Sequence, residues 1–119
     1  MAEHNEFGKV GEQLAVAHLI KHGYQIKYRN YRFLKAEVDI IAQKGATLAI
    51  VEVKSRTTNF MDDLNDLIPP KKRKLLVLAA DHYVVEQKLD VDVRFDIITI
   101  FKRNGSFKID HIEDAFYHF

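Results

Sequence analysis

The sequence predicts an α/β protein with a mixed β-sheet flanked by helices, in the element order α-β-β-β-α-β-β. Two segments show helical periodicity, and the others alternate in the manner of strands. Two turn signals, Lys44-Gly45 and Asn104-Gly105, join strands into hairpins. Because a helix separates the third and fourth strands, the fourth is predicted to run parallel to the third. The 119 residues are expected to form one domain spanning 1–119.

The first helix is predicted over 5–22, because two apolar stripes run along it and Gly23 follows. Strands are predicted over 24–33, 37–42, 48–54 and 91–102, followed by a last strand that contains Phe107 and His111. The second helix begins at Pro69-Pro70 and continues for about 18 residues, since proline is tolerated in a first turn. Segment 57–68 lacks periodicity and is predicted to be a mobile acidic loop containing Asp62, Asp63 and Asp66. Four aromatic residues are expected in the core: Tyr24, Tyr28, Phe95 and Phe101.

The composition excludes several classes of protein. There is no cysteine, which removes disulfides, thiolate zinc sites and a cysteine nucleophile. The formal net charge of +1 shows that any nucleic-acid binding must depend on where the charges lie. No apolar run approaches the roughly 20 residues needed to span a bilayer. The first residues lack the pattern of a signal peptide, so we expect a cytoplasmic protein without a membrane partner.

Carboxylates occupy strand positions where apolar residues are expected. Alternation places Glu52 and Lys54 on the face of Leu48 and Ile50. In an antiparallel pair the partner numbers have a constant sum, and an odd sum places Asp39 on the same face as Glu52. A two- or four-residue loop at Lys44-Gly45 gives an odd sum, whereas a three-residue loop would separate the two acids.

Two carboxylates held close together repel each other unless a cation lies between them. Oxygen ligands and the absence of cysteine favour Mg²⁺ or Mn²⁺ over zinc. The alternative is an ion pair of Lys54 with Glu52 or Glu37 at a solvated end of the sheet. Glu12 favours the metal interpretation because it interrupts an apolar stripe of the first helix, and nearby Gly8 and Gly11 would permit close approach to the sheet or to a ligand. Glu12 could instead be satisfied by a backbone N–H or by Arg32.

An ordered set of motifs resembles the bacterial YraN-type family, which belongs to the PD-(D/E)XK nuclease superfamily. The motifs are Gly8-x-x-Gly11-Glu12, Asn30-x-Arg32, Glu37-Val38-Asp39-Ile40-Ile41-Ala42, Val51-Glu52-Val53-Lys54-x-Arg56 and Arg94-Phe95-Asp96, together with Lys72 and Ala115-Phe116. The resemblance covers almost the whole chain and implies a restriction-endonuclease-like fold. Two departures are Ala36, where glycine is expected, and the acidic segment 60–67.

The resemblance also implies the roles of individual residues. Asp39 and Glu52 would bind the metal with the Val53 carbonyl, Glu12 would complete or orient the site, and Lys54 would position or deprotonate the attacking water. The expected activity is a divalent-metal-dependent endonuclease acting on DNA or structured nucleic acid. The alternative is a non-catalytic nucleic-acid-binding or protein-interaction module that retains the nuclease fold. By analogy with related resolvases, a homodimer is possible.

Basic residues form a candidate nucleic-acid surface. The second helix begins with four consecutive cations, which are mildly unfavourable at a helix N-terminus and would be explained by a phosphate partner: Lys71, Lys72, Arg73 and Lys74. Arg32 and Arg56 could extend this surface.

His18 and His22 have a helical spacing that can bind metal, but no third ligand is evident, so they are more simply explained as surface histidines. Arg94 and Asp96 are expected to form a structural ion pair.

Overall fold

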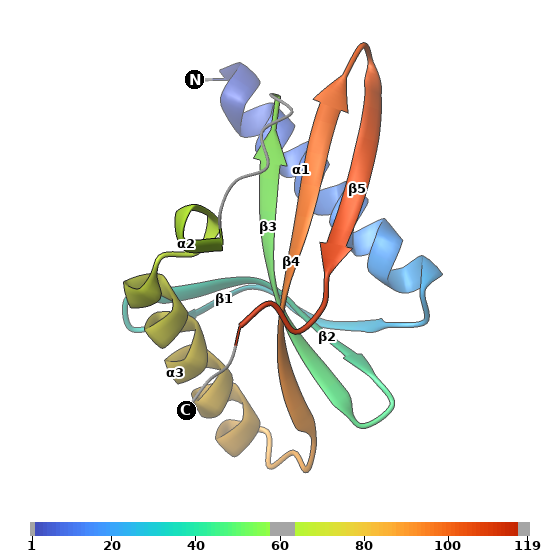
Figure 1. Ribbon diagram of the computed structural model, residues 1–119. Helices are drawn as coiled ribbons and strands as arrows, with labels where there is room; N and C mark the ends of the chain where they lie inside the picture. Colours follow the sequence, from blue (N-terminus) through green and yellow to red (C-terminus); the bar gives the residue numbers. More distant parts are fainter. Residues whose placement is uncertain (1, 58–63, 117–119) are drawn as a thin grey trace.

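The computed structural model describes the backbone of residues 2–57 and 64–116 (Figure 1). The elements are α1 (Ala2–Lys21), β1 (Gln25–Phe33), β2 (Ala36–Lys44), β3 (Thr47–Arg56), α2 (Leu64–Leu67), α3 (Pro70–Glu86), β4 (Asp92–Arg103) and β5 (Ser106–Ile112). The predicted α/β order is confirmed, with the short helix α2 as an addition. This helix corrects the expectation of an irregular loop, because burial of Leu67 and Ile68 fixes one helical turn there. Asp66 lies on α2, whereas Asp62 and Asp63 lie outside the described residues.

The five strands form one sheet in the order β1-β2-β3-β4-β5. Strands β3 and β4 pair in parallel, and the other neighbouring strands pair antiparallel. The parallel pair follows from the helical connection through α2 and α3, as the sequence predicts. Within the described residues, no helix has the length and apolar character needed to cross a membrane.

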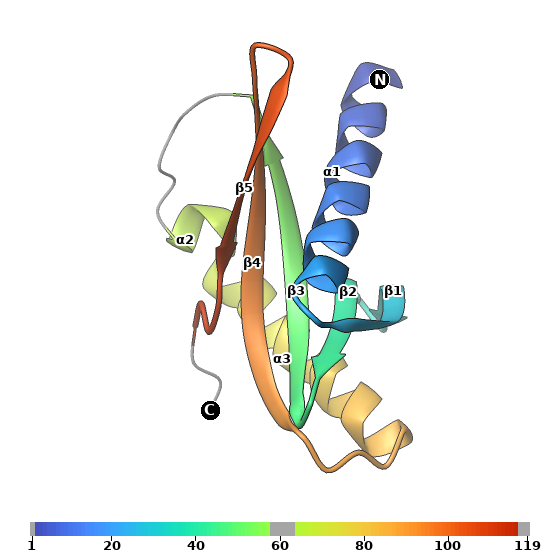
Figure 2. The same ribbon diagram turned by 90° about the vertical axis from the view of Figure 1, so that its right-hand side faces the viewer.

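Helices cover both faces of the sheet, with α1 on one face and α3 on the other (Figures 1 and 2). Alternate residues of β3 therefore enter two separate cores. Leu48 and Ile50 pack with Leu76 of α3, whereas Ala49 and Val51 lie in the core that α1 covers. This two-sided burial explains the nearly continuous apolar run of β3.

Gly11 allows α1 to approach β3 closely. A Cβ atom at position 11 would lie 2.0 Å from the Ser55 Oγ atom, whereas one at Gly8 would meet nothing within 4 Å. Close approach to the sheet therefore accounts for Gly11 and not for Gly8.

The edge strand β1 differs from expectation, because a bulge between Ile26 and Tyr28 leaves Tyr28 51% exposed instead of in the core.

The β2–β3 hairpin has the odd register that brings the acids together. Its partner numbers sum to 91, as in Ile40 with Val51, and its two turn residues are 45–46, one position later than the expected Lys44-Gly45. The pairing of β2 with β3 ends at Ile40 and Val51. Asp39 and Glu52 are the next residues along the two strands, so they lie where β2 separates from β3.

Candidate metal centre

Asp39 replaces part of the missing backbone pairing at the end of the hairpin. Its Oδ2 atom accepts a hydrogen bond of 2.8 Å from the Val53 N–H. Burial and the neighbouring Glu52 carboxyl group raise the pKa of Asp39 to about 7, despite the opposing effects of the Val53 N–H and Lys72. Two acids therefore share a low-dielectric position where a cation would favour the ionised form of both.

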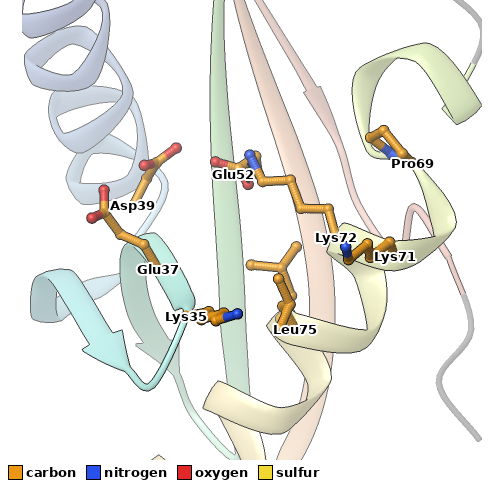
Figure 3. A pocket seen from close by; sticks show the side chains of 9 residues that line it. Lys35, Glu37, Asp39, Glu52, Pro69, Lys71, Lys72 and Leu75 are labelled. Carbon is orange, nitrogen blue, oxygen red and sulfur yellow. Dashed lines mark ion pairs between the residues drawn. The ribbon is translucent and has the colours of Figure 1, made fainter.

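Glu52 is the buried member of the pair, with a side chain only 5% exposed. Among the described residues, its Oε2 atom accepts no hydrogen bond of regular geometry, but it lies 2.9 Å from the Lys72 Nζ atom. Figure 3 shows the Lys72 side chain extending from α3 across the gap to Glu52 on β3. Lys72 is thus the cation that balances Glu52, a partner that the sequence analysis did not assign. Burial of a carboxylate within a strand is the signal that a partner is required, but it does not say which lysine supplies it.

Lys54 contributes a second, partly buried ammonium group on the same face of β3. Burial lowers its pKa, and the nearby Lys72 lowers it further, whereas Glu52 and Asp39 act in the opposite direction. The predicted juxtaposition of Asp39, Glu52 and Lys54 is therefore present, with Lys72 added from α3.

Glu12 faces the same end of the sheet from α1. Its Oε1 atom lies 3.2 Å from Arg29 Nη2 and 3.4 Å from Asn30 Nδ2, both on β1. Glu12 and Asp39 line one cavity of about 740 Å³, which also includes Gly8. The carboxylate of Glu12 is thus directed to the cavity that contains Asp39, while its ion-pair partner is Arg29 and not Arg32.

A second cavity of about 420 Å³ lies on the α3 side of the same acids (Figure 3). Asp39, Glu52 and Lys72 line it, together with Lys35 and Lys71. Because Asp39 lines both cavities, it stands at the junction between the α1 side and the α3 side of the sheet.

The predicted nucleic-acid-binding residues occupy different surroundings. Arg32 and Arg56 line the larger cavity, where Arg32 also forms a 2.7 Å ion pair with Glu37. Lys71 lines the smaller cavity. Lys74 instead lies on a different surface of α3, beside Val77 and Leu78.

Arg73 is turned toward the protein. Its Nε atom donates to the Ile68 carbonyl oxygen at 2.9 Å, and its Nη2 atom donates to Asn65 Oδ1 at 2.7 Å. Its guanidinium group also lies 5.6 Å from the centre of the Phe116 ring. Arg73 thereby joins α3 to the α2 segment and to the end of the chain.

The donor chemistry at the hairpin end fits a hard divalent cation. Glu52 provides buried carboxylate oxygens, Asp39 provides half-buried ones, and Glu12 lines the adjoining cavity. The predicted binding of the metal by the Val53 carbonyl oxygen stays a prediction. The N–H group of the same residue donates a hydrogen bond to Asp39. Mg²⁺ or Mn²⁺ would replace the repulsion between the two acids by attraction to one ion.

A separate polar cluster surrounds Asp96 on β4. Asp96, His111 and Glu113 each bring one potential ligand atom to within 4.8 Å of the others, so this group could hold a metal ion. Arg94 occupies much of that position, with Nη2 at 2.8 Å from Asp96 Oδ2 and 3.0 Å from Glu113 Oε2. The expected ion pair of Arg94 with Asp96 is therefore confirmed.

These features define a mixed α/β protein with a carboxylate and lysine cluster where two strands separate. The model of the uncharacterised protein family UPF0102 matches residues 11–100, and the chain belongs to that family. It is 54% identical over 119 residues to a UPF0102 protein of Christiangramia forsetii and 52% identical over 119 residues to one of Flavobacterium psychrophilum, covering 100% of each chain in both cases. A UPF0102 protein of Bacteroides thetaiotaomicron is 50% identical over 117 residues, covering 98% of this chain and 97% of the relative.

Proposed function

We propose that this protein is a divalent-metal-dependent endonuclease of the PD-(D/E)XK superfamily that hydrolyses phosphodiester bonds in DNA or structured nucleic acid. The observation that carries the proposal is the position of Asp39 beside buried Glu52. This neighbour and burial raise the pKa of Asp39 to about 7. Such a pair is unfavourable at neutral pH without a cation, and enzymes that transfer phosphoryl groups use acids of this kind to hold one.

Asp39 and Glu52 would hold Mg²⁺ or Mn²⁺, with Glu12 completing or orienting the site from α1. The ion would supply Lewis-acid activation of the phosphate and of the attacking water. Lys54, partly buried beside Glu52, would act as a base for the water or as a charge partner of the phosphate. Lys72 neutralises Glu52 when no ion is bound and would turn toward the substrate phosphate when the ion takes its place.

The cations around the acids support a nucleic-acid substrate. Lys35 and Lys71 line the cavity on the α3 side, and Arg32 and Arg56 line the cavity on the α1 side. A phosphate backbone laid across the hairpin end would meet positive groups on both sides of the acids. Binding should therefore weaken steeply as salt concentration rises, despite the net charge of only +1.

The test is cleavage of duplex, branched and single-stranded DNA and of RNA, with Mg²⁺ or Mn²⁺. We expect Asp39→Asn and Glu52→Gln to reduce cleavage by at least about 100-fold. Asp110→Asn is the matched control, since this exposed acid lies on β5, away from both cavities, and should leave activity unchanged. Equal activity in the wild type and both site variants would contradict the proposal. Salt-sensitive binding without cleavage under either metal would instead identify a non-catalytic nucleic-acid-binding module.

A further inference from the structure

The two edges of the sheet differ in how well they are protected against pairing with another strand. The edge strand β1 has a bulge between Ile26 and Tyr28 and carries Lys27 and Arg29, and bulges and cations of this kind oppose pairing. The opposite edge strand, β5, pairs with β4 in one register along its whole length, and five of its seven residues are exposed (Figure 1). A regular, exposed edge readily accepts another strand. The outer edge of β5 is therefore a candidate interaction surface.

The turn between β4 and β5 determines which backbone groups of β5 face outward. Its residues, Asn104-Gly105, have φ angles of 50° and 79°, as in a two-residue type I′ turn. The pair that flanks such a turn, Arg103 with Ser106, is a hydrogen-bonded pair, and bonded and non-bonded pairs alternate from there. Every second residue of β5 therefore directs its backbone N–H and C=O groups away from β4. These outward residues are Phe107, Ile109 and His111.

The side chains of β5 favour one register for pairing with a second copy of the same strand. Two copies related by a two-fold axis pair antiparallel, and the backbone bonds require outward residues to face outward residues. When Ile109 faces its own copy, Lys108 of each strand faces Asp110 of the other. Registers centred on Lys108 or on Asp110 would place like charges face to face, which is unfavourable. Registers centred on Phe107 or on His111 bring no opposite charges together.

The register centred on Ile109 also uses side chains that the single chain leaves exposed. Within the part of the chain that the structure describes, Lys108 and Asp110 are exposed and form no ion pair. Ile109 packs partly buried against the core that α1 covers, so facing its own copy would continue that core across the interface. Phe107 and Ile112 are 38% and 42% exposed, and this register would cover both.

We propose that two copies of this protein associate through the outer edges of their β5 strands, by antiparallel pairing centred on Ile109. The five-stranded sheet of one copy then continues into that of the other. Both free edges of the joined sheet are β1 strands, whose bulge and cations oppose further growth, so the assembly closes at two copies. Each chain keeps its own hairpin acids, so this proposal does not depend on the proposed nuclease activity.

The test is analytical ultracentrifugation of the complete chain over a range of concentrations, which gives the dissociation constant of the dimer. We expect Lys108→Glu to raise this constant at least about tenfold, because it places like charges opposite each other twice in the symmetric pair. Combining Lys108→Glu with Asp110→Lys should restore the wild-type constant, since every pair is again of opposite sign. Lys88→Glu is the matched control, because it makes the same change of charge at an exposed position after α3. Asp110→Asn alone loses only a weak attraction and should leave the dimer largely intact.

A second pair of variants tests the backbone pairing. Phe107→Pro removes an N–H group that faces away from β4, so the hairpin should persist while pairing with the second copy is blocked. Phe107→Ala keeps this N–H group and should weaken the dimer much less than Phe107→Pro.

Three results would overturn the proposal. They are a wild type that stays monomeric at every concentration, a wild-type dissociation constant in Lys108→Glu, or failure of the exchanged charges to restore pairing. If Phe107→Pro does not fold, Lys108→Glu and its rescue carry the test. Asp39→Asn and Glu52→Gln should dimerise like the wild type, so this proposal and the proposed nuclease centre can fail separately.

Discussion

Replacing Asp39 with asparagine should stabilise the metal-free protein at neutral and alkaline pH and leave its stability nearly unchanged in acid. Asparagine resembles the protonated form of the acid, which burial and Glu52 favour in the folded state. The wild type holds a proton on Asp39 up to a pH of about 7 when folded but only to about 3.8 when unfolded. Between these values the folded state binds more protons, so wild-type stability falls as pH rises.

The magnitude follows from the size of the shift. Each pH unit of difference in pKa corresponds to about 1.4 kcal/mol. Raising the pKa of Asp39 from 3.8 to about 7 therefore destabilises the wild type by at most about 4 kcal/mol above neutral pH. Below a pH of about 4 the Asp39→Asn variant and the wild type should have similar free energies of unfolding, and near pH 5.5 they should differ by about 2 kcal/mol.

Urea denaturation of both proteins across this pH range measures the difference. Taking the difference between variant and wild type cancels titration of groups common to both. Asp110→Asn, the exposed matched control, should stay within about 0.5 kcal/mol of the wild type at every pH. Saturating Mg²⁺ at alkaline pH should stabilise the wild type and not Asp39→Asn. A difference that does not change between acid and alkaline pH would refute the reasoning that Asp39 lies partly buried beside the Glu52 carboxyl group.

Four further substitutions test other contacts of the fold. Lys72→Met should destabilise the metal-free protein by about 1–3 kcal/mol, since it leaves Glu52 without its ion-pair partner. Mg²⁺ should recover part of that loss in thermal melts. A metal-free variant as stable as the wild type would contradict the role of Lys72 as the cation that balances Glu52. Gly8→Ala should gain about 0.5–1 kcal/mol of stability from helix propensity. Gly11→Ala should be less stable than Gly8→Ala, because its Cβ atom would lie 2.0 Å from a hydroxyl oxygen on β3. Equal urea midpoints for the two variants would contradict the close approach of α1 to β3. Asp96→Asn should cost about 3–5 kcal/mol in urea unfolding, because the buried hydrogen-bonded ion pair loses its anion; a loss under 1 kcal/mol would show that Asp96 does not organise its cluster.

The sequence predicts the acid cluster because a two-residue turn gives the hairpin an odd register, and a turn displaced by one position keeps it odd. Asp39 and Glu52 therefore still follow directly after the last pair, Ile40 with Val51. Alternation does not determine the face of Asp39 itself, because Val38 and Ile41 both lie in the core that α3 covers. Likewise the charge within the apolar run of β3 shows that Glu52 requires a cation. Its pairing with Lys72 depends on how α3 packs over β3, and periodicity along one segment does not determine the relative placement of two elements.

The contact between His18 and His111 shows the same limit, because these two residues become neighbours only when β5 pairs beside β4. Tyr28 illustrates a local failure, because alternation predicts a buried ring and the bulge in β1 turns it outward. Bulges insert one residue into an otherwise regular period, so the pattern that precedes them no longer predicts the face that follows.

The most direct measurement of the central claim is a crystal structure of the protein soaked in Mn²⁺, with the ion located by its anomalous scattering. We expect a peak shared by the carboxylate oxygens of Asp39 and Glu52, with the Lys72 ammonium group displaced from Glu52. Occupied Mn²⁺ positions elsewhere, with the Lys72–Glu52 ion pair intact at saturating metal, would contradict the proposed metal centre and the hydrolytic function that depends on it.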